Sequence, residues 1–155
     1  MWWRRVRYLL ALAALCSVAT CPAAQRSCSA RRDAREADEL LAYLADRVDA
    51  QVAATGRVPP LPAGPTPAAG CCEQGGICQP DEALWVAPGW RALGFSIDGE
   101  FRYSYQYLPD ESGKAAVLRA TGHLSCDSDG AVYELRLTVD GDKVSRAWTR
   151  TNPLD

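Results

Sequence analysis

The sequence has few of the residues from which active sites are built. It contains a single histidine, His123, which lies beside a turn. No serine elbow and no paired base can be recognised around that histidine, so general acid–base or nucleophilic chemistry has little to rest on. We therefore expect a protein that is not an enzyme and uses no cofactor. A small disulfide-bonded hydrolase is the remote alternative.

The sequence also lacks a long hydrophobic run. The main apolar stretch extends from Tyr8 to about Ala19, and Pro22 soon interrupts it. A permanent membrane-spanning helix needs about 20 apolar residues, so this stretch is short for an anchor. Arginines among the first seven residues precede the stretch, which is the arrangement of a secretory leader.

We predict a signal peptide over residues 1–24, with cleavage after Ala23 or Ala24. A second interpretation is lipidation of Cys21, which would make the protein an outer-membrane lipoprotein. Lipoprotein processing usually wants Gly, Ala or Ser before the cysteine, and Thr20 occupies that position, so this interpretation is the weaker one. Either route predicts an exported protein, periplasmic or extracellular, that meets a membrane only if Cys21 is acylated.

An excess of positive charge is absent as well. The whole chain has a formal net charge of −2, and removal of a leader with three arginines and no acidic residue would leave about −5. Nucleic-acid-binding domains carry a basic surface, so we expect no nucleic acid partner. The remaining length fits one small folded domain, residues 25–155.

Residues 25–57 are predicted to hold an N-terminal amphipathic helix, most regular from Ser29 to about Ala54 and ended by Gly56. Apolar residues spaced by three and four form its buried face: Ala37, Leu41, Leu44, Val48 and Val52. The opposite face is predicted to be a solvated surface of mixed charge: Arg32, Arg35, Glu36, Glu39, Asp46, Arg47 and Asp49.

Residues 58–80 form a proline-rich and cysteine-rich segment. From Val58 to Pro67 prolines remove too many backbone donors for a helix or a central strand. We predict an extended connector that lies over its own domain, with a polyproline ligand for another protein as the alternative.

Residues 81–155 are predicted to form an antiparallel sheet. Alternating aromatic residues and short turns rich in Asp and Gly indicate four strands, at 101–107, Ala115–Gly122, Ala131–Val139 and Lys143–Trp148. The expected fold class is α+β, an N-terminal amphipathic helix packed on a four-stranded antiparallel β-meander and stapled by disulfides.

Exported proteins use cysteines mainly for disulfides. The candidates are Cys71, Cys72, Cys78 and Cys126. A bond between the adjacent Cys71 and Cys72 would be strained, so each is expected to pair with Cys78 or Cys126, and both connectivities stay open. A zinc site would need these thiols reduced. Cys28 is the odd thiol, either free or intermolecular.

An acidic turn precedes the third predicted strand. Asp127 and Asp129, with Gly130, could offer oxygen ligands to calcium. The spacing is only a fragment of a calcium loop, and an ordinary Asp/Gly turn explains it as well. We expect no metal, with these two carboxylates as weak calcium candidates.

Three segments together carry a family resemblance: residues 90–97 (WRALGFSI), 101–107 (FRYSYQY) and 120–127 (ATGHLSCD). In this order and spacing the chain from about Leu40 onward resembles the globular head of bacterial type IV pilin-like proteins. The resemblance implies a helix packed on an antiparallel sheet, and cysteine pairs in some members.

The N-terminus departs from the pilin pattern. The apolar run follows arginines directly, has no Gly-Phe or Gly-Met processing site, and meets no acidic residue before Asp33. We therefore predict a pilin-like head without the polymerising tail. Its expected role is structural, adhesive or secretion-associated, with a cell-envelope or secretion-associated protein as partner. The alternative is a lipoprotein accessory domain that binds a partner.

Overall fold

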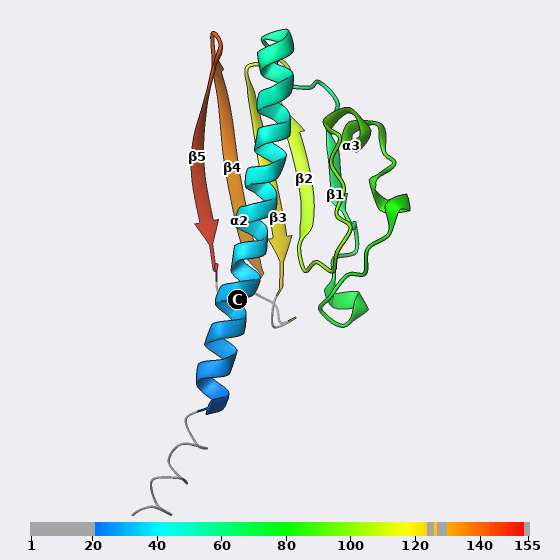
Figure 1. Ribbon diagram of the computed structural model, residues 1–155, viewed down its shortest axis with the longest axis vertical. Helices are drawn as coiled ribbons and strands as arrows, with labels where there is room; N and C mark the ends of the chain where they lie inside the picture. Colours follow the sequence, from blue (N-terminus) through cyan, green and yellow to red (C-terminus); the bar gives the residue numbers. More distant parts are fainter. Residues whose placement is uncertain (1–20, 124–125, 127–129, 154–155) are drawn as a thin grey trace, which may run out of the picture.

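The protein has two layers, one long helix and one antiparallel sheet (Figure 1), so the predicted α+β class is confirmed. This computed structural model describes residues 21–123, 126 and 130–153, with side chains described from residue 34 onward. The helix is α2 (Cys21–Thr55). The strands are β1 (Ala63–Thr66), β2 (Ser104–Pro109), β3 (Ala115–Gly122), β4 (Ala131–Asp140) and β5 (Lys143–Thr151).

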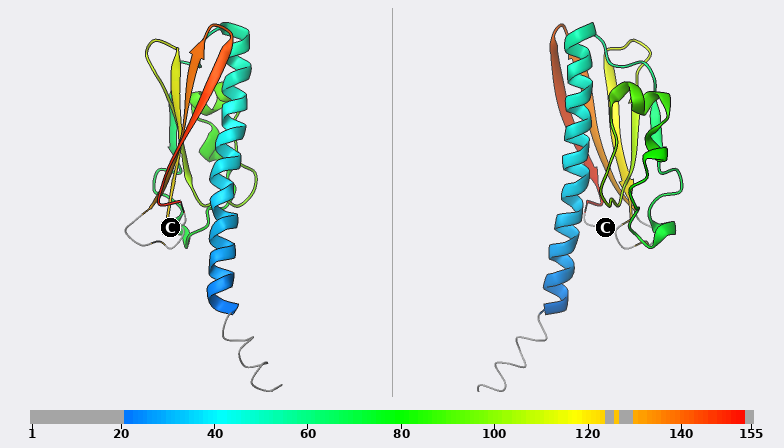
Figure 2. Two further views of the ribbon diagram at one scale, coloured as in Figure 1. Left: turned by 90° about the vertical axis from the view of Figure 1, so that its left-hand side faces the viewer. Right: turned by 45° about the vertical axis from the view of Figure 1, so that its right-hand side comes forward.

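Helix α2 buries the apolar stripe predicted from its spacing. Leu41, Leu44 and Val48 have no exposed surface, because they pack against the sheet. The helix begins at Cys21, before the predicted start at residue 25, and ends directly before Gly56. Figure 2 shows α2 lying along one face of the sheet while its first turns extend beyond the end of the sheet.

The sheet presents one face to α2 through strict alternation of its side chains. Tyr107 of β2 stands opposite Leu118 of β3, which stands opposite Leu135 of β4. All three are fully buried, and the alternate residues Val117 and Arg119 of β3 are half-buried on the other face. This pattern is that of an antiparallel sheet with one face packed and one face solvated.

The predicted four-stranded meander is wrong, because the sheet has five strands in the order β1-β2-β3-β4-β5. The additional strand, β1, lies within residues 58–80, which we predicted to be a connector. The chain between β1 and β2 spans residues 67–103, far longer than the tight turn of a meander. This stretch is called the connecting segment below.

Strand β1 is possible in a proline-rich sequence because it lies at the edge of the sheet. Only one side of an edge strand needs backbone donors, so Pro65 is tolerated there. Gly64 has a φ of 80°, and a Cβ at this position would lie 2.2 Å from the carbonyl oxygen of Tyr105. Only glycine therefore permits the close approach of β1 to β2.

The connecting segment contains three short helices: η1 (Cys72–Gln74), η2 (Glu82–Trp85) and α3 (Pro88–Leu93). The short helix α3 contacts both α2 and β1. Its carboxyl end is held by side chains of α2. Arg47 Nε donates a hydrogen bond to the carbonyl oxygen of Leu93 at 2.9 Å, and Gln51 donates to that of Ala92 at 3.3 Å.

Aromatic side chains bind the connecting segment to the core. Trp90 is fully buried, with its ring centroid 5.4 Å from that of Trp85 and 5.2 Å from that of Phe95. Its Nε1 donates a hydrogen bond to Thr66 Oγ1 at 2.8 Å, which ties α3 to β1. Buried indole groups usually need such a partner.

The edge strand β5 is fastened to α2 by ion pairs. Arg146 contacts Asp46 at 2.7 Å and also Asp49, while Arg150 contacts Asp38 at 2.9 Å. The predicted solvated face of the helix is therefore wrong in part. Asp46, Asp49 and Arg47 have specific partners that are far away in the sequence.

Candidate functional site

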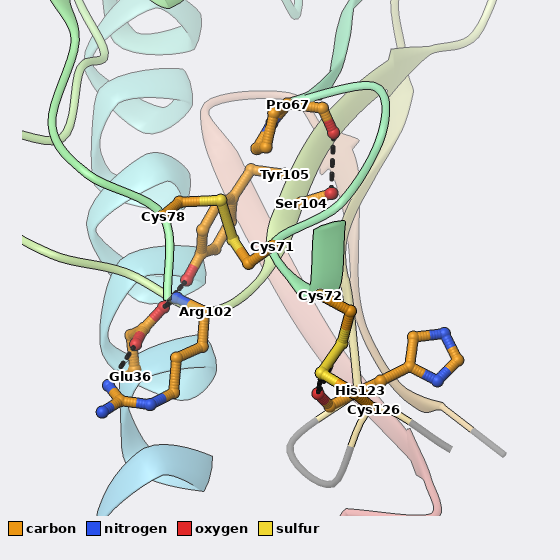
Figure 3. The surroundings of a disulfide bond; sticks show 10 residues. All are labelled: Glu36, Pro67, Cys71, Cys72, Cys78, Arg102, Ser104, Tyr105, His123 and Cys126. Carbon is orange, nitrogen blue, oxygen red and sulfur yellow. Dashed lines mark hydrogen bonds and ion pairs between the residues drawn. A yellow bond between two sulfur atoms is a disulfide. The ribbon is translucent and has the colours of Figure 1, made fainter. Parts of the chain in front are cut away.

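Two disulfides staple the connecting segment at the end of the head from which α2 projects (Figures 1 and 3). Cys71 pairs with Cys78 and Cys72 with Cys126, with Cα–Cα distances of 5.0 and 5.5 Å. These distances suit a disulfide without backbone displacement. The two connectivities that the sequence left open are thereby reduced to one.

The two disulfides differ in their exposure and in what they join. Cys71 and Cys78 are buried and close a tight loop around η1. Cys126 is exposed, and its bond to Cys72 spans 54 positions, which links the connecting segment to the region just after β3. The Cys72 sulfur lies 3.1 Å from the carbonyl oxygen of His123. The long disulfide therefore joins the short helix η1 to a position four residues beyond the end of β3.

Hydrogen bonds extend from the disulfide-linked segment towards the sheet. The amide and carbonyl of Cys78 pair with those of Phe101 at 2.7 and 3.1 Å, just before β2 begins. Ser104 is buried, and its hydroxyl donates to the carbonyl oxygen of Pro67 at 2.7 Å. The Cys78–Phe101 pairing thus closes the connecting segment on itself next to β2, and the Ser104 hydrogen bond holds its first residue against the start of β2.

A half-buried carboxylate joins α2 to the same region (Figure 3). Glu36 Oε1 accepts a hydrogen bond from the backbone amide of Arg102 at 2.8 Å and from the Tyr105 hydroxyl at 3.1 Å. Its other oxygen lies 3.7 Å from the Arg102 guanidinium. Burial raises the pKa of Glu36, and the hydrogen bonds and the nearby guanidinium oppose that rise. Glu36 is therefore an anchoring group, and its assignment to a solvated face was wrong.

The tyrosine next to Glu36, Tyr105, is held in the neutral form. Burial raises the pKa of Tyr105 well above its usual value, and the negative charge of Glu36 adds to this effect. A phenol in this state donates its proton in a hydrogen bond and keeps it. The Glu36–Tyr105 pair therefore serves to orient α2 against β2.

The single histidine lies at the surface of this end. His123 is exposed, and its ring lies over Gly130, where a Cβ would approach ring atoms to 2.6 Å. The stick view in Figure 3 shows its imidazole pointing away from Glu36 and Arg102. His123 and Glu36 are therefore not arranged to share a proton.

The calcium candidates Asp127 and Asp129 lie outside the described residues. Cys21 and Cys28 lie on the backbone of α2, and their side chains are outside the described part of the chain. Among the residues that the structure does describe, no three His, Cys, Asp or Glu side chains are grouped as metal ligands.

Sequence reasoning found the cysteines of this site but missed Glu36, Arg102 and Ser104. Glu36 directly precedes Ala37, at the boundary between the polar and apolar faces of the helix, and nothing in its spacing distinguishes it from the solvated acids. Its partners come from 66 and 69 positions away. Only the folded arrangement brings them together.

None of the helices within residues 21–123, 126 and 130–153 has an apolar stretch long enough to cross a membrane. Comparison with known proteins gave no match to any protein family, to any curated protein or to any solved structure.

Proposed function

We propose that the protein is an exported, non-enzymatic, pilin-like head that acts through its surface, as a structural, adhesive or secretion-associated component of the cell envelope. The observation that carries this proposal is the pair of disulfides, Cys71–Cys78 and Cys72–Cys126. Disulfides persist in oxidising compartments outside the cytoplasm. They therefore agree with the leader pattern at residues 1–24.

The architecture supports an interaction role. One long helix packs on an antiparallel sheet and projects beyond it, so the head is carried at the end of a helical stalk (Figure 2). The same order, a helix followed by an antiparallel sheet, is the arrangement that the pilin resemblance implies. Fold likeness alone does not fix a function, so the partner has to come from the surface of the head.

Lipidation remains the second candidate because of one specific feature, the position of Cys21. It begins α2 and follows the sequence Val18-Ala19-Thr20. An acyl group there would tether the head to a membrane by its helical stalk. Cleavage after Ala24 would instead remove Cys21 and the first turn of α2.

The test is intact mass spectrometry of the chain produced in a bacterium with its own leader, before and after reduction. We expect a mature N-terminus at Ala24 or Gln25, two internal disulfides and no lipid. A diacylglyceryl mass that disappears in Cys21→Ser would establish the lipoprotein instead. An uncut chain with reduced cysteines in the cytoplasm would overturn export altogether.

A further inference from the structure

The two disulfides of the head differ in whether a reagent in solution can reach their sulfurs. Cys78 has no exposed surface and Cys71 is 3% exposed, so their bond lies in the core. Cys126 is exposed and Cys72 is half-buried, and Figure 3 shows their bond beside His123, apart from the buried pair. Thiol–disulfide exchange requires a thiolate to reach a disulfide sulfur, so the Cys72–Cys126 bond is the one open to attack.

Two glycines close to the exposed sulfur leave it without cover on their side. A Cβ added at Gly76 would lie 3.6 Å from the Cys126 sulfur, and a Cβ at Gly75 would meet nothing within 4 Å. These two adjacent residues therefore supply no side chain that would shield the bond.

The backbone at Cys126 also favours opening. Its φ is 56°, in the left-handed region that residues other than Gly, Asn and Asp rarely adopt. The oxidised chain therefore holds a costly backbone conformation at one end of the long disulfide. Disulfides that are exposed or held under strain are reduced more easily than buried ones.

A hydrogen-bond acceptor is in place for the thiol that opening releases. The carbonyl oxygen of His123 lies 3.1 Å from the Cys72 sulfur and 3.5 Å from the Cys126 sulfur. After reduction the Cys72 S–H can donate to this carbonyl, so the half-buried thiol has a partner.

The rest of the head does not depend on the long disulfide for its contacts. Cys71–Cys78 closes the loop around η1 by itself, and Cys78 pairs with Phe101 through both its amide and its carbonyl. The layer of α2 and the sheet is held by apolar burial. Opening of Cys72–Cys126 therefore removes the covalent link between η1 and the chain after β3 and leaves the core in place.

We propose that the Cys72–Cys126 bond is a thiol-exchange site, which a dithiol opens while the rest of the head stays folded. One thiolate of the dithiol attacks Cys126 Sγ, the S–S bond breaks, and Cys72 leaves as a thiolate that takes up a proton. The second thiol of the reagent, as its thiolate, attacks the mixed disulfide and releases Cys126 as a thiol. The disulfide of the head gains two electrons and two protons, and the dithiol loses them as it closes to its own disulfide. This inference goes beyond the proposed interaction role, because it makes the long disulfide a redox-sensitive link.

The experiment is graded reduction of the purified, oxidised full chain with dithiothreitol, after alkylation of its other thiols. Samples are quenched with an excess of a second alkylating reagent, and tandem mass spectrometry locates the label, including on the adjacent Cys71 and Cys72. We expect Cys72 and Cys126 to be labelled at least about tenfold faster than Cys71 and Cys78, because their sulfurs are accessible. Backbone hydrogen exchange should rise in η1 and stay unchanged in β3 and β4.

Glutathione, a monothiol, identifies the attacked sulfur because it stops at the mixed disulfide. We expect the glutathione adduct on Cys126 and the alkylated thiol at Cys72. An adduct mainly on Cys72 would overturn the proposed direction of attack.

Leu135→Ala separates local opening from unfolding of the whole head. It removes a fully buried side chain of β4 and so favours unfolding, while both disulfides are kept. Labelling of Cys72 and Cys126 should stay within about twofold of the parent rate, whereas labelling of Cys71 and Cys78 should become faster. Low concentrations of urea, applied to the parent chain, give the same comparison without a substitution.

Three results would overturn the proposal. Equal labelling rates at all four cysteines, or acceleration of all four in Leu135→Ala or in low urea, would mean that reduction requires global unfolding. Resistance of all four to dithiothreitol in the folded chain would mean that the long disulfide is as closed as the buried one. Faster labelling of Cys71 and Cys78 would reverse the assignment of the labile bond.

Discussion

The helix–sheet layer and the connecting segment are held together by different means. In the layer, α2 and strands β2–β5 bury one another through regular spacing, with continuous backbone pairing between strands. In the connecting segment, short helices alternate with irregular chain. Two disulfides, a few hydrogen bonds and a cluster of aromatic rings hold it in place.

The difference indicates which contacts hold each part of the molecule in place. The layer depends on many small contributions of apolar burial, so it needs no covalent link. The connecting segment depends on a few large contacts, and it also supplies all the residues that line a surface hollow of about 580 Å³. Four experiments test this contrast, and they are described from the largest expected effect to the weakest.

The largest effect is expected from Trp90→Ala. The change removes a fully buried ring and leaves Thr66 without its hydrogen-bond donor. Loss of such a side chain costs about 3–5 kcal/mol of unfolding free energy. Urea unfolding should show this loss, and hydrogen exchange should speed up in the connecting segment more than in β3 and β4.

The control for this prediction is Trp148→Ala, in the edge strand β5. Trp148 is only half-buried against the core, so its removal should cost clearly less. An equal cost for the two tryptophans would mean that the aromatic cluster has no special role in holding the connecting segment.

The second effect concerns the long disulfide. Replacing both partners, Cys72→Ser with Cys126→Ser, frees a loop of 54 positions and should cost roughly 4 kcal/mol on the chain-entropy account. The short disulfide, removed as Cys71→Ala with Cys78→Ala, should cost about 2 kcal/mol from loop entropy. Chemical denaturation of both variants under identical conditions gives the two values. A larger cost for the short disulfide would show that burial of its sulfurs outweighs loop closure.

The same contrast separates what the sequence could predict from what it could not. The buried stripe of α2 and the alternating faces of β3 and β4 follow from residue spacing. A helical or a strand period places the apolar residues on one face, and that face is the one that packs against the core. Strand β1 could not be found that way, since Pro65 within it and the prolines on either side of it suppress every strand signal. Its pairing becomes possible only because β2 has an edge free to receive it.

The candidate site was predictable only as a set of residue types. The four paired cysteines were identified, but their partners depended on how the connecting segment folds. Glu82 begins the short helix η2 and Asp98 lies in irregular chain, and in neither place does residue spacing indicate which surface a side chain meets. The acids of α2 looked alike in sequence, although arginines of β5 pair with some of them while Glu39 has no ion pair with another described residue.

The third effect tests the ion pairs between the helix and the edge strand. Arg146→Gln removes the contacts with Asp46 and Asp49 and should cost about 1 kcal/mol, since partly exposed ion pairs contribute little individually. Arg136→Gln, on the neighbouring strand β4 and without a described ion pair, is the matched control. Thermal unfolding at low and high salt should separate the two variants only at low salt. Identical melting curves would mean that the ion pairs do not stabilise the packing of β5 on α2.

The smallest effect concerns pH and Glu36. Because burial raises its pKa above the usual 4.5, the folded chain keeps this proton to higher pH than the unfolded chain does. The contribution of Glu36 to stability is therefore fully present below pH 4.5 and is lost as pH rises through the folded pKa. Melting temperatures of the parent and of Glu36→Gln should be measured across this range. As pH rises, the melting temperature of the parent should fall relative to that of Glu36→Gln.

Tyr105→Phe sharpens the same measurement. It removes a hydrogen bond that favours the ionised carboxylate, so the pKa of Glu36 should rise further and the loss should extend to higher pH. A difference between parent and Glu36→Gln that does not change with pH would mean that the Arg102 contacts fully offset burial. In that case the link between α2 and the start of β2 would behave as a surface contact, and the connecting segment would depend on its disulfides and aromatic rings alone.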